Sequence, residues 1–179
     1  MLKDQIIISK VTADDLDTLR NLSIKTFYES FIWGNTEENI RHYIDNFFPA
    51  EKLASEIATP SSEFYFAMMN GNAIGYLKIN FGNAQTELQD NNGLEIERIY
   101  VKKEAQGKRI GQLLFDQAIT IANNKNLDYL WLGVWEKNPG AIKFYERNGL
   151  VQFATHPFRL GDDLQTDIMM KLDFKNRHV

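Results

Sequence analysis

The 179-residue chain contains no cysteine. This absence excludes a disulfide scaffold, a thiolate metal site and a cysteine nucleophile, and it fits a reducing compartment such as the cytoplasm. The three histidines, His42, His156 and His178, are scattered along the chain and share no metal-ligand spacing. We therefore expect no metal site.

Long apolar runs and an excess of positive charge are also lacking. No stretch approaches the roughly 18 apolar residues that a membrane-spanning helix needs, and the first 15 residues lack the pattern of a signal peptide. The formal net charge is −4, whereas nucleic-acid-binding proteins are more often basic. The sequence therefore predicts neither a membrane nor a nucleic-acid partner, and its mildly acidic balance favours a cationic one.

The apolar content is sufficient for one sizeable core, because 44% of the residues are hydrophobic and 12% are aromatic. No repeat, low-complexity tract or linker interrupts the chain, so we expect a single domain over residues 1–179. Periodicity and capping residues predict the elements. The expected helices run from Thr12 to about Phe31 and over 36–48, 50–59, 109–124 and 139–149; the expected strands cover 5–10, 63–69, 73–80, 94–101, 128–135 and a closing pair around Gly161-Asp162.

The order of these elements predicts an α/β fold with a mixed sheet. Residues 94–135 read as strand, helix, strand, so the two strands should be parallel with a right-handed crossover. The run "DYLWLGVW" (128–135) is almost continuously apolar, which is typical of a strand in the sheet interior. The hairpins on either side should be antiparallel.

The turn "QGKRIG" (106–111) joins the first of these parallel strands to the helix that follows. Free amides and the positive end of the helix dipole make such a helix start an anion site, and Gly107 and Gly111 permit a close approach of backbone and ligand. An ordinary strand-to-helix turn is the alternative. Neither the P-loop pattern nor the G-x-G-x-x-G dinucleotide pattern is present.

Two sequence blocks at the proper separation resemble the GNAT superfamily of N-acetyltransferases. The first is the family's pyrophosphate motif, here Gln106 to Gly111, in which Arg109 stands where the family usually has its first glycine. The second block matches at Asn138, Ala141, Phe144, Tyr145, Gly149 and Leu150. The strings "LEIERIY", "WLGVWEKN" and "GDDLQTDIMMK" look like the PaiA-type bacterial polyamine acetyltransferases within that superfamily.

The resemblance implies a GNAT fold, with a mixed, mostly antiparallel sheet, flanking helices and a parallel strand pair that splays apart. Acetyl-CoA would lie in the splay and its pyrophosphate on the turn. We expect Arg109 to be helical and to donate its backbone N–H to phosphate. The side chains of Arg109 and Lys108 would add charge-assisted contacts to a phosphate, with solvated surface charge as the alternative for both. The implied coenzyme A site comprises Ile99, Tyr100, Val101, Gln106, Gly107, Lys108, Arg109, Ile110, Gly111, Gln112, Asn138, Ala141, Tyr145 and Arg147.

The resemblance also implies catalytic roles. Tyr145 matches the tyrosine that protonates the coenzyme A thiolate, although a packed core tyrosine would fit the same position. Asn138 matches a coenzyme-binding asparagine, and helix capping alone would also explain it. For the general base we favour Glu97, because a buried unpaired carboxylate has a raised pKa. A salt bridge, for instance to Lys78, is the alternative for Glu97, and Glu95 and Glu136 are its rivals.

Aromatic rings and carboxylates near the first two helices suit an extended polycation. The predicted acceptor-binding residues are Phe27, Tyr28, Glu29, Trp33, Trp135 and Glu136, with an ordinary core role as the alternative for Phe27. Gly133 fits the close approach of a ligand or marks a bulge. We expect direct acetyl transfer to a primary amine, most simply a polyamine such as spermidine or spermine. The alternatives are a protein N-terminus, a lysine, an aminoglycoside or a non-catalytic acyl-CoA sensor, and a homodimer is possible.

Overall fold

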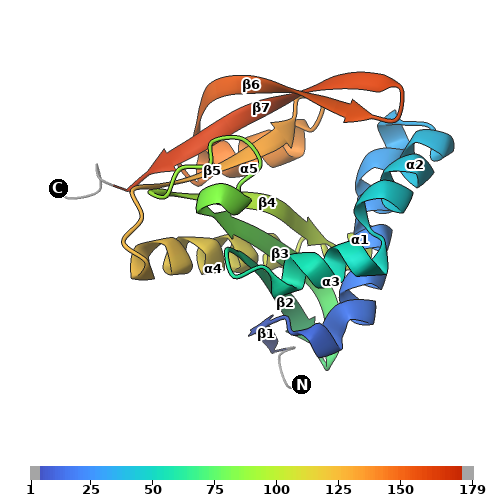
Figure 1. Cartoon of the computed structure of the whole chain (residues 1–179), viewed down its shortest axis with the longest axis horizontal. Helices are drawn as coiled ribbons and strands as arrows, with labels where there is room; N and C mark the ends of the chain where they lie inside the picture. Colours follow the sequence, from blue (N-terminus) through green and yellow to red (C-terminus); the bar gives the residue numbers. More distant parts are fainter. Residues whose placement is uncertain (1–4, 175–179) are drawn as a thin grey trace.

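The computed structural model describes residues 5–174, so that His178 lies outside it. The elements follow the expected order closely (Figure 1). Thr12 does not begin the first long helix directly, because a 3-10 turn over Ala13–Asp15 precedes it. The helices are α1 Leu16–Phe31, α2 Glu37–Phe47, α3 Ala50–Ala58, α4 Ile110–Asn124 and α5 Pro139–Arg147. The strands are β1 Ile6–Lys10, β2 Ser62–Met69, β3 Asn72–Phe81, β4 Gly93–Val101, β5 Tyr129–Trp135, β6 Val151–Leu160 and β7 Asp163–Asp173.

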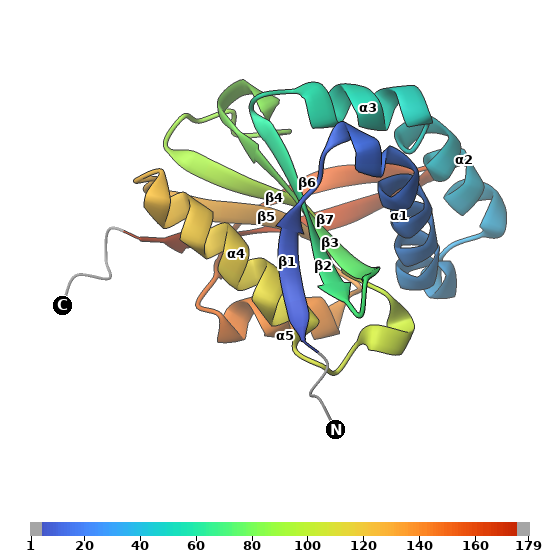
Figure 2. The same ribbon diagram turned by 90° about the horizontal axis from the view of Figure 1, so that it is seen from below.

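One seven-stranded sheet has the order β1-β2-β3-β4-β5-β7-β6. The β4–β5 pair is parallel and the other five pairs are antiparallel. Helices α4 and α5 cover one face of the sheet, whereas α1, α2 and α3 lie on the other (Figure 2). The predicted mixed α/β sheet is therefore confirmed, and the interior strand predicted over 128–135 is β5, Tyr129–Trp135.

Two apolar layers fix the helices on the sheet. Leu114, Phe115 and Ala118 of α4 are fully buried against alternate residues of the central strands, as the i, i+4 spacing requires. On the opposite face, Leu19 and Leu22 of α1 pack with aromatic residues of β2 and β3. A separate cluster joins α1, α2 and α3 to the end of β6 through Phe27, Ile40, Phe48, Leu53 and Leu160.

The parallel strands pair over only part of their length. Their register runs from Gly93↔Tyr129 to Ile96↔Leu132 and then stops. At this point β4 has a bulge, because Lys78 and Ile79 of β3 pair with Arg98 and Ile96 and leave Glu97 unmatched. A bulge bends its strand and increases the local twist. The second half of β4 therefore turns away from β5, and the sheet splits as the resemblance implied.

No helix within residues 5–174 is long and apolar enough to cross a membrane. Nor do three or more His, Asp or Glu side chains of that range come together in a group that would hold a metal ion.

Candidate active site

A cleft of about 1510 Å³ opens where the two parallel strands separate. We call one side of it the glycine end, formed by residues 106–112 and α5, and the other side the aromatic end, formed by α1, α2, the loop at Thr86 and Glu87, β6, β7, residues 95–98 of β4 and the end of β5 at Trp135. The separated halves of β4 and β5 form the floor between them. Predicted site residues that line the cleft are Phe27, Glu95, Glu97, Ile99, Tyr100, Val101, Gln106, Gly107, Arg109, Ile110, Gly111, Gln112, Gly133, Trp135, Asn138, Ala141, Tyr145 and Arg147.

The backbone of the turn at the glycine end contradicts one prediction. Arg109 is left-handed, with φ 62° and ψ 17°, and it is the N-cap of α4. The helical conformation expected for it is therefore wrong. A side chain costs roughly 1–2 kcal/mol in this region, because its Cβ crowds the backbone, and the turn imposes this conformation even without glycine. Gly107 has a φ of 79° and meets the same requirement without strain.

The backbone N–H groups in the first turn of α4 have no side-chain acceptor, and the space next to them is open. No side chain caps this helix start, and the first N–H groups of any α-helix lack an intrahelical acceptor. A Cβ added at Gly107 or Gly111 would meet no atom within 4 Å. Uncapped amides, a positive dipole end and unfilled space over two glycines fit a bound anion such as a pyrophosphate.

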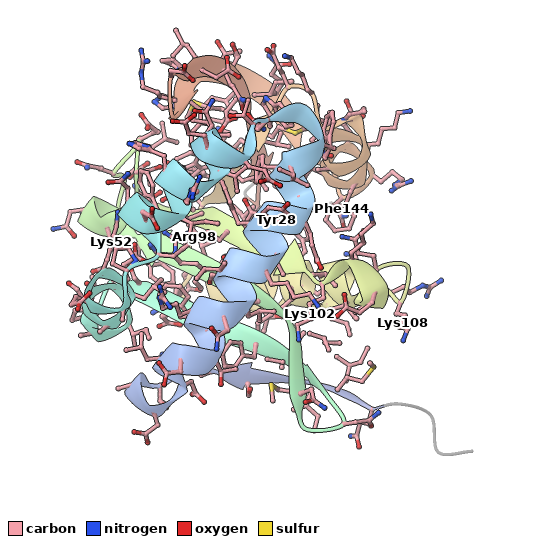
Figure 3. All side chains as sticks on the ribbon, turned by 90° about the vertical axis from the view of Figure 1, so that its right-hand side faces the viewer. Tyr28, Lys52, Arg98, Lys102, Lys108 and Phe144 are labelled. Atoms are coloured by element: carbon pink, nitrogen blue, oxygen red, sulfur yellow. The ribbon has the colours of Figure 1, made fainter. Side chains whose placement is uncertain are left out.

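Polar side chains of the glycine end divide into structural and exposed groups. Gln106 donates through Nε2 to the carbonyl of Val101 at 3.2 Å and so ties the turn to β4. Gln112 donates to Oδ1 of Asn148 at 2.7 Å and links α4 to α5. Arg147 is exposed at the cleft, whereas Lys108 projects outward from the turn (Figure 3) and does not line it.

The floor has an unpaired strand edge. Ile99, Tyr100 and Val101 pair with β3 through one edge, and within residues 5–174 no strand pairs with their other edge. An extended ligand with amide groups fits such an edge as a missing strand would. Opposite it, Gly133 stands in regular register with Met169, so the bulge considered for Gly133 is absent.

Helix α5 brings a buried tyrosine to the cleft. Tyr145 is 7% exposed, and burial raises the pKa of its phenol well above the usual value, so that it stays protonated at neutral pH. Asn138 accepts from the amide of Ala141 at 3.1 Å, so its side-chain oxygen caps α5. The capping role considered for Asn138 is thus present, and Pro139 follows at the first helical position.

Glu97 forms a salt-bridge network instead of the unpaired carboxylate that we expected. One of its oxygens lies 2.6 Å from Nζ of Lys78 and the other lies 3.0 Å from the guanidinium of Arg98. Burial by itself would raise the pKa of Glu97, but Arg98, Lys78 and a hydrogen bond from Asn80 lower it below its usual value. The expected raised pKa is therefore wrong, because the bulge directs Glu97 and Arg98 to the same face. Glu56 completes the network with both cations.

The two rivals of Glu97 differ in position. Glu95 is 3% exposed, and burial raises its pKa even though Thr86 and Asn80 donate to it. Glu136 is exposed, lies beyond the end of β5 and does not line the cleft.

Only two of the six predicted acceptor-binding residues line the aromatic end, namely Phe27 and Trp135. Phe27 is 2% exposed and stacks on Tyr43 with centroids 4.2 Å apart, so it is a core residue as well. Trp33 covers Trp135 from outside and is 62% exposed. Tyr28 is on the exposed side of α1, where it donates to Glu37 (Figure 3), and Glu29 accepts the amide of Lys103.

Sequence reasoning missed several residues of the aromatic end. They come from segments far apart in the chain: Tyr43, Phe47, Phe48, Thr86, Glu87, His156, Phe158, Arg159 and Asp167. The available signal for Asp167 was a carboxylate directly before the apolar run "IMM" (168–170) within an expected strand. Burial raises the pKa of Asp167 to about 6, with Glu136 adding to the effect and His156 opposing it.

Comparison with known proteins gives a consistent result. A sequence model of the Acetyltransferase (GNAT) family matches residues 17–150. An uncharacterised N-acetyltransferase from the pepI 3′ region of Lactobacillus delbrueckii subsp. lactis is 42% identical over 164 residues, 92% of this chain and 95% of that protein. The spermidine N(1)-acetyltransferase of Thermoplasma acidophilum is 26% identical over 175 residues, 96% of this chain and 99% of that protein. The crystal structure of PaiA N-acetyltransferase from Thermoplasma acidophilum in complex with coenzyme A superposes with a TM-score of 0.81 at 25% identity, covering 95% and 99% of the two chains.

Proposed function

The chain belongs to the acetyltransferase (GNAT) family, and on that premise we propose that it transfers an acetyl group from acetyl-CoA directly to a primary amine, in particular a polyamine such as spermidine. Acetyl-CoA supplies the activated acetyl group as a thioester. Since the chain has no cysteine, no acyl-enzyme forms on a thiol. The proposed transfer is direct, with both substrates bound in the cleft together.

The glycine end and the floor supply the groups that hold the coenzyme. The uncapped amides at the start of α4 bind pyrophosphate above Gly107 and Gly111. The unpaired edge of β4 at Ile99 to Val101 binds the amides of the pantetheine arm. A relative of similar fold was crystallised with coenzyme A, which supports this assignment.

Tyr145 protonates the departing sulfur. Its phenol is buried at the cleft and remains protonated, so a proton is available where the carbon–sulfur bond breaks. Placing an acid at the leaving group contributes typically 10²- to 10⁴-fold to rate.

The acidic lining of the aromatic end is the observation that carries the choice of a polyamine. Four carboxylates line that part of the cleft, those of Glu87, Glu95, Glu97 and Asp167. The arginines that line the same part are Arg98 and Arg159, and Arg98 is matched by Glu56 and Glu97. The carboxylates therefore outnumber the arginines there. Aromatic rings from α1, α2 and β6 complete a surface that suits an extended chain of ammonium groups. The spermidine acetyltransferase among the relatives supports the same class.

A panel of amines tests the proposal. We would measure thiol release from acetyl-CoA with spermidine, spermine, an aminoglycoside, a lysine peptide and a peptide with a free N-terminus. We expect the polyamines to give the largest kcat/KM. If only the peptides or only the aminoglycoside were acetylated, the proposed substrate would be that acceptor and not a polyamine. Coenzyme A binding without turnover of any amine would instead indicate an acyl-CoA sensor.

A further inference from the structure

Three of the four carboxylates at the aromatic end are engaged by protein groups. Glu97 contacts two cations and Asn80. Glu95 accepts the amide and the hydroxyl of Thr86, at 2.9 and 2.5 Å. Glu87 lies 2.9 Å from Nε2 of His156. Each of these three carboxylates therefore already contacts at least one donor or cation of the protein.

Asp167 is the exception. It is partly buried, it lines the cleft, and no hydrogen bond or ion pair joins its carboxylate to another residue of the 5–174 range. Its carboxylate is partly desolvated and has no donor from the protein, so only water in the cleft or a bound ligand donates to it. A perturbed carboxylate in a cleft is a candidate functional group.

The position of Asp167 directs it toward the gap between the separated strands. It pairs with Trp135 in β5 and with His156 in β6. A Cβ built on Gly133 would lie 3.4 Å from Oδ2 of Asp167. The absence of a side chain at Gly133 therefore leaves this carboxylate accessible from the floor of the cleft. This gives Gly133 a function that neither a bulge nor a positive φ explains.

The charged groups around Asp167 are few. His156 faces it from β6 and Glu136 from the end of β5, and Glu87 reaches it indirectly through His156. Because burial is the main influence, the pKa of Asp167 is raised to about 6. At pH 7 to 8 it is ionised, and it is a stronger base than Glu97, whose pKa is lowered.

We propose that Asp167 is the general base that takes the proton from the acceptor ammonium, an inference that rests on the proposed function. The ammonium first gives one proton to a carboxylate oxygen of Asp167, which later releases it to water. The neutral amine nitrogen then forms a bond to the thioester carbonyl carbon and loses its remaining excess proton to water. The carbon–sulfur bond breaks with its electron pair on sulfur, and Tyr145 protonates that sulfur before regaining a proton from water.

Asp167→Asn tests the inference by the shape of its pH profile. We would measure kcat/KM for spermidine with saturating acetyl-CoA between about pH 6 and 9.5. Wild-type activity should change little between the pKa of Asp167 and that of the amine, near ~10. The variant should lose about 10²- to 10³-fold at pH 7. It should then rise roughly tenfold per pH unit as free amine accumulates. Coenzyme A affinity should be unchanged.

Asp173→Asn is the matched control. Asp173 is in the same strand, pairs with Lys171 at 3.0 Å and does not line the cleft, so this variant should match wild type in rate and profile. The thermal midpoint of Asp167→Asn should equal or exceed that of wild type, because the change removes a desolvated charge. A loss of rate therefore does not report misfolding.

The possible outcomes separate the two hypotheses. If wild type is active and the pH profile of kcat/KM for Asp167→Asn runs parallel to that of wild type, the base role is overturned and the proposed function is left intact. So does a rise in spermidine KM with unchanged kcat, which would make Asp167 a binding residue only. Coenzyme A binding by a wild type that acetylates no amine overturns both.

Discussion

The glycine end of the cleft comes from two segments that are near each other in the chain, residues 106–112 and α5, whereas the aromatic end combines α1, α2, a loop and the β6–β7 hairpin. At the glycine end, backbone amides and glycines form most of the proposed coenzyme site. The residues that matter there are close in sequence, so they form a recognisable short motif. At the aromatic end, side chains from distant segments meet, and most of them also contact other side chains of the protein. A short sequence motif is therefore enough to locate the binding site of the acetyl donor. The binding site of the acceptor becomes visible only when the tertiary structure brings its residues together.

The largest effect that we expect when the two ends of the cleft are compared by mutation is on kcat, at Tyr145. Tyr145→Phe should lower kcat about 10²- to 10³-fold, because the departing sulfur loses its acid. Coenzyme A affinity should persist, as should the pH profile set by Asp167. Tyr129→Phe is the control, since the Tyr129 hydroxyl donates to Asp90 outside the cleft. Steady-state kinetics and calorimetric titration measure both quantities, and an unchanged kcat would refute the acid role.

The second prediction concerns folding at the aromatic end. Glu97→Gln should lower the free energy of unfolding by about 3 kcal/mol, because Lys78 and Arg98 remain buried with only Glu56 to match them. The pKa of Glu97 is lower in the folded state, so its stabilisation is present above the unfolded pKa and is lost as pH falls through the folded value. The difference between wild type and variant should therefore shrink below about pH 4.

Urea unfolding at pH 7 and pH 3 measures this difference. Glu104→Gln is the control, because Glu104 pairs with Lys25 at the exposed surface and should contribute no measurable stability. Equal stability of Glu97→Gln and wild type at pH 7 would show that the network is not a structural unit.

The third prediction places a methyl group in the anion site. Gly111→Ala should stabilise α4 by roughly 0.5–1 kcal/mol, because alanine is the better helix former. The same methyl would occupy the open space above the first turn, so coenzyme A affinity should fall about tenfold, which corresponds to 1.4 kcal/mol. Calorimetric titration checks the affinity. Tighter or equal binding would mean that the coenzyme does not approach Gly111.

The smallest effect is expected at Arg109. Arg109→Gly should raise the free energy of unfolding by about 1 kcal/mol, since glycine adopts the left-handed conformation without strain. Arg109→Ala removes the same charge but keeps a Cβ, so it should not show this gain. Any fall in coenzyme A affinity that both variants share measures the contribution of the Arg109 guanidinium to coenzyme binding. Equal stability of the two variants would contradict the conformational explanation.

Sequence reasoning succeeded where local rules decide the structure. Apolar periodicity and turn residues gave the elements, and the strand-helix-strand order gave the parallel pair. It failed at Arg109 because residue type alone does not determine φ in a turn that tolerates strain. It failed at Glu97 because the bulge that brings Arg98 to the same face depends on register with β3. Asp167 was missed because its significance depends on Gly133, 34 positions earlier.

The most direct test of the account is product analysis. Purified protein would be incubated with acetyl-CoA and spermidine, and mass spectrometry would quantify acetylated spermidine against the thiol released. The account predicts equal amounts of the two products and, in the absence of amine, thiol release no faster than without protein. Thiol release that continues without acetylated amine, or the absence of both products despite coenzyme A binding, would contradict it.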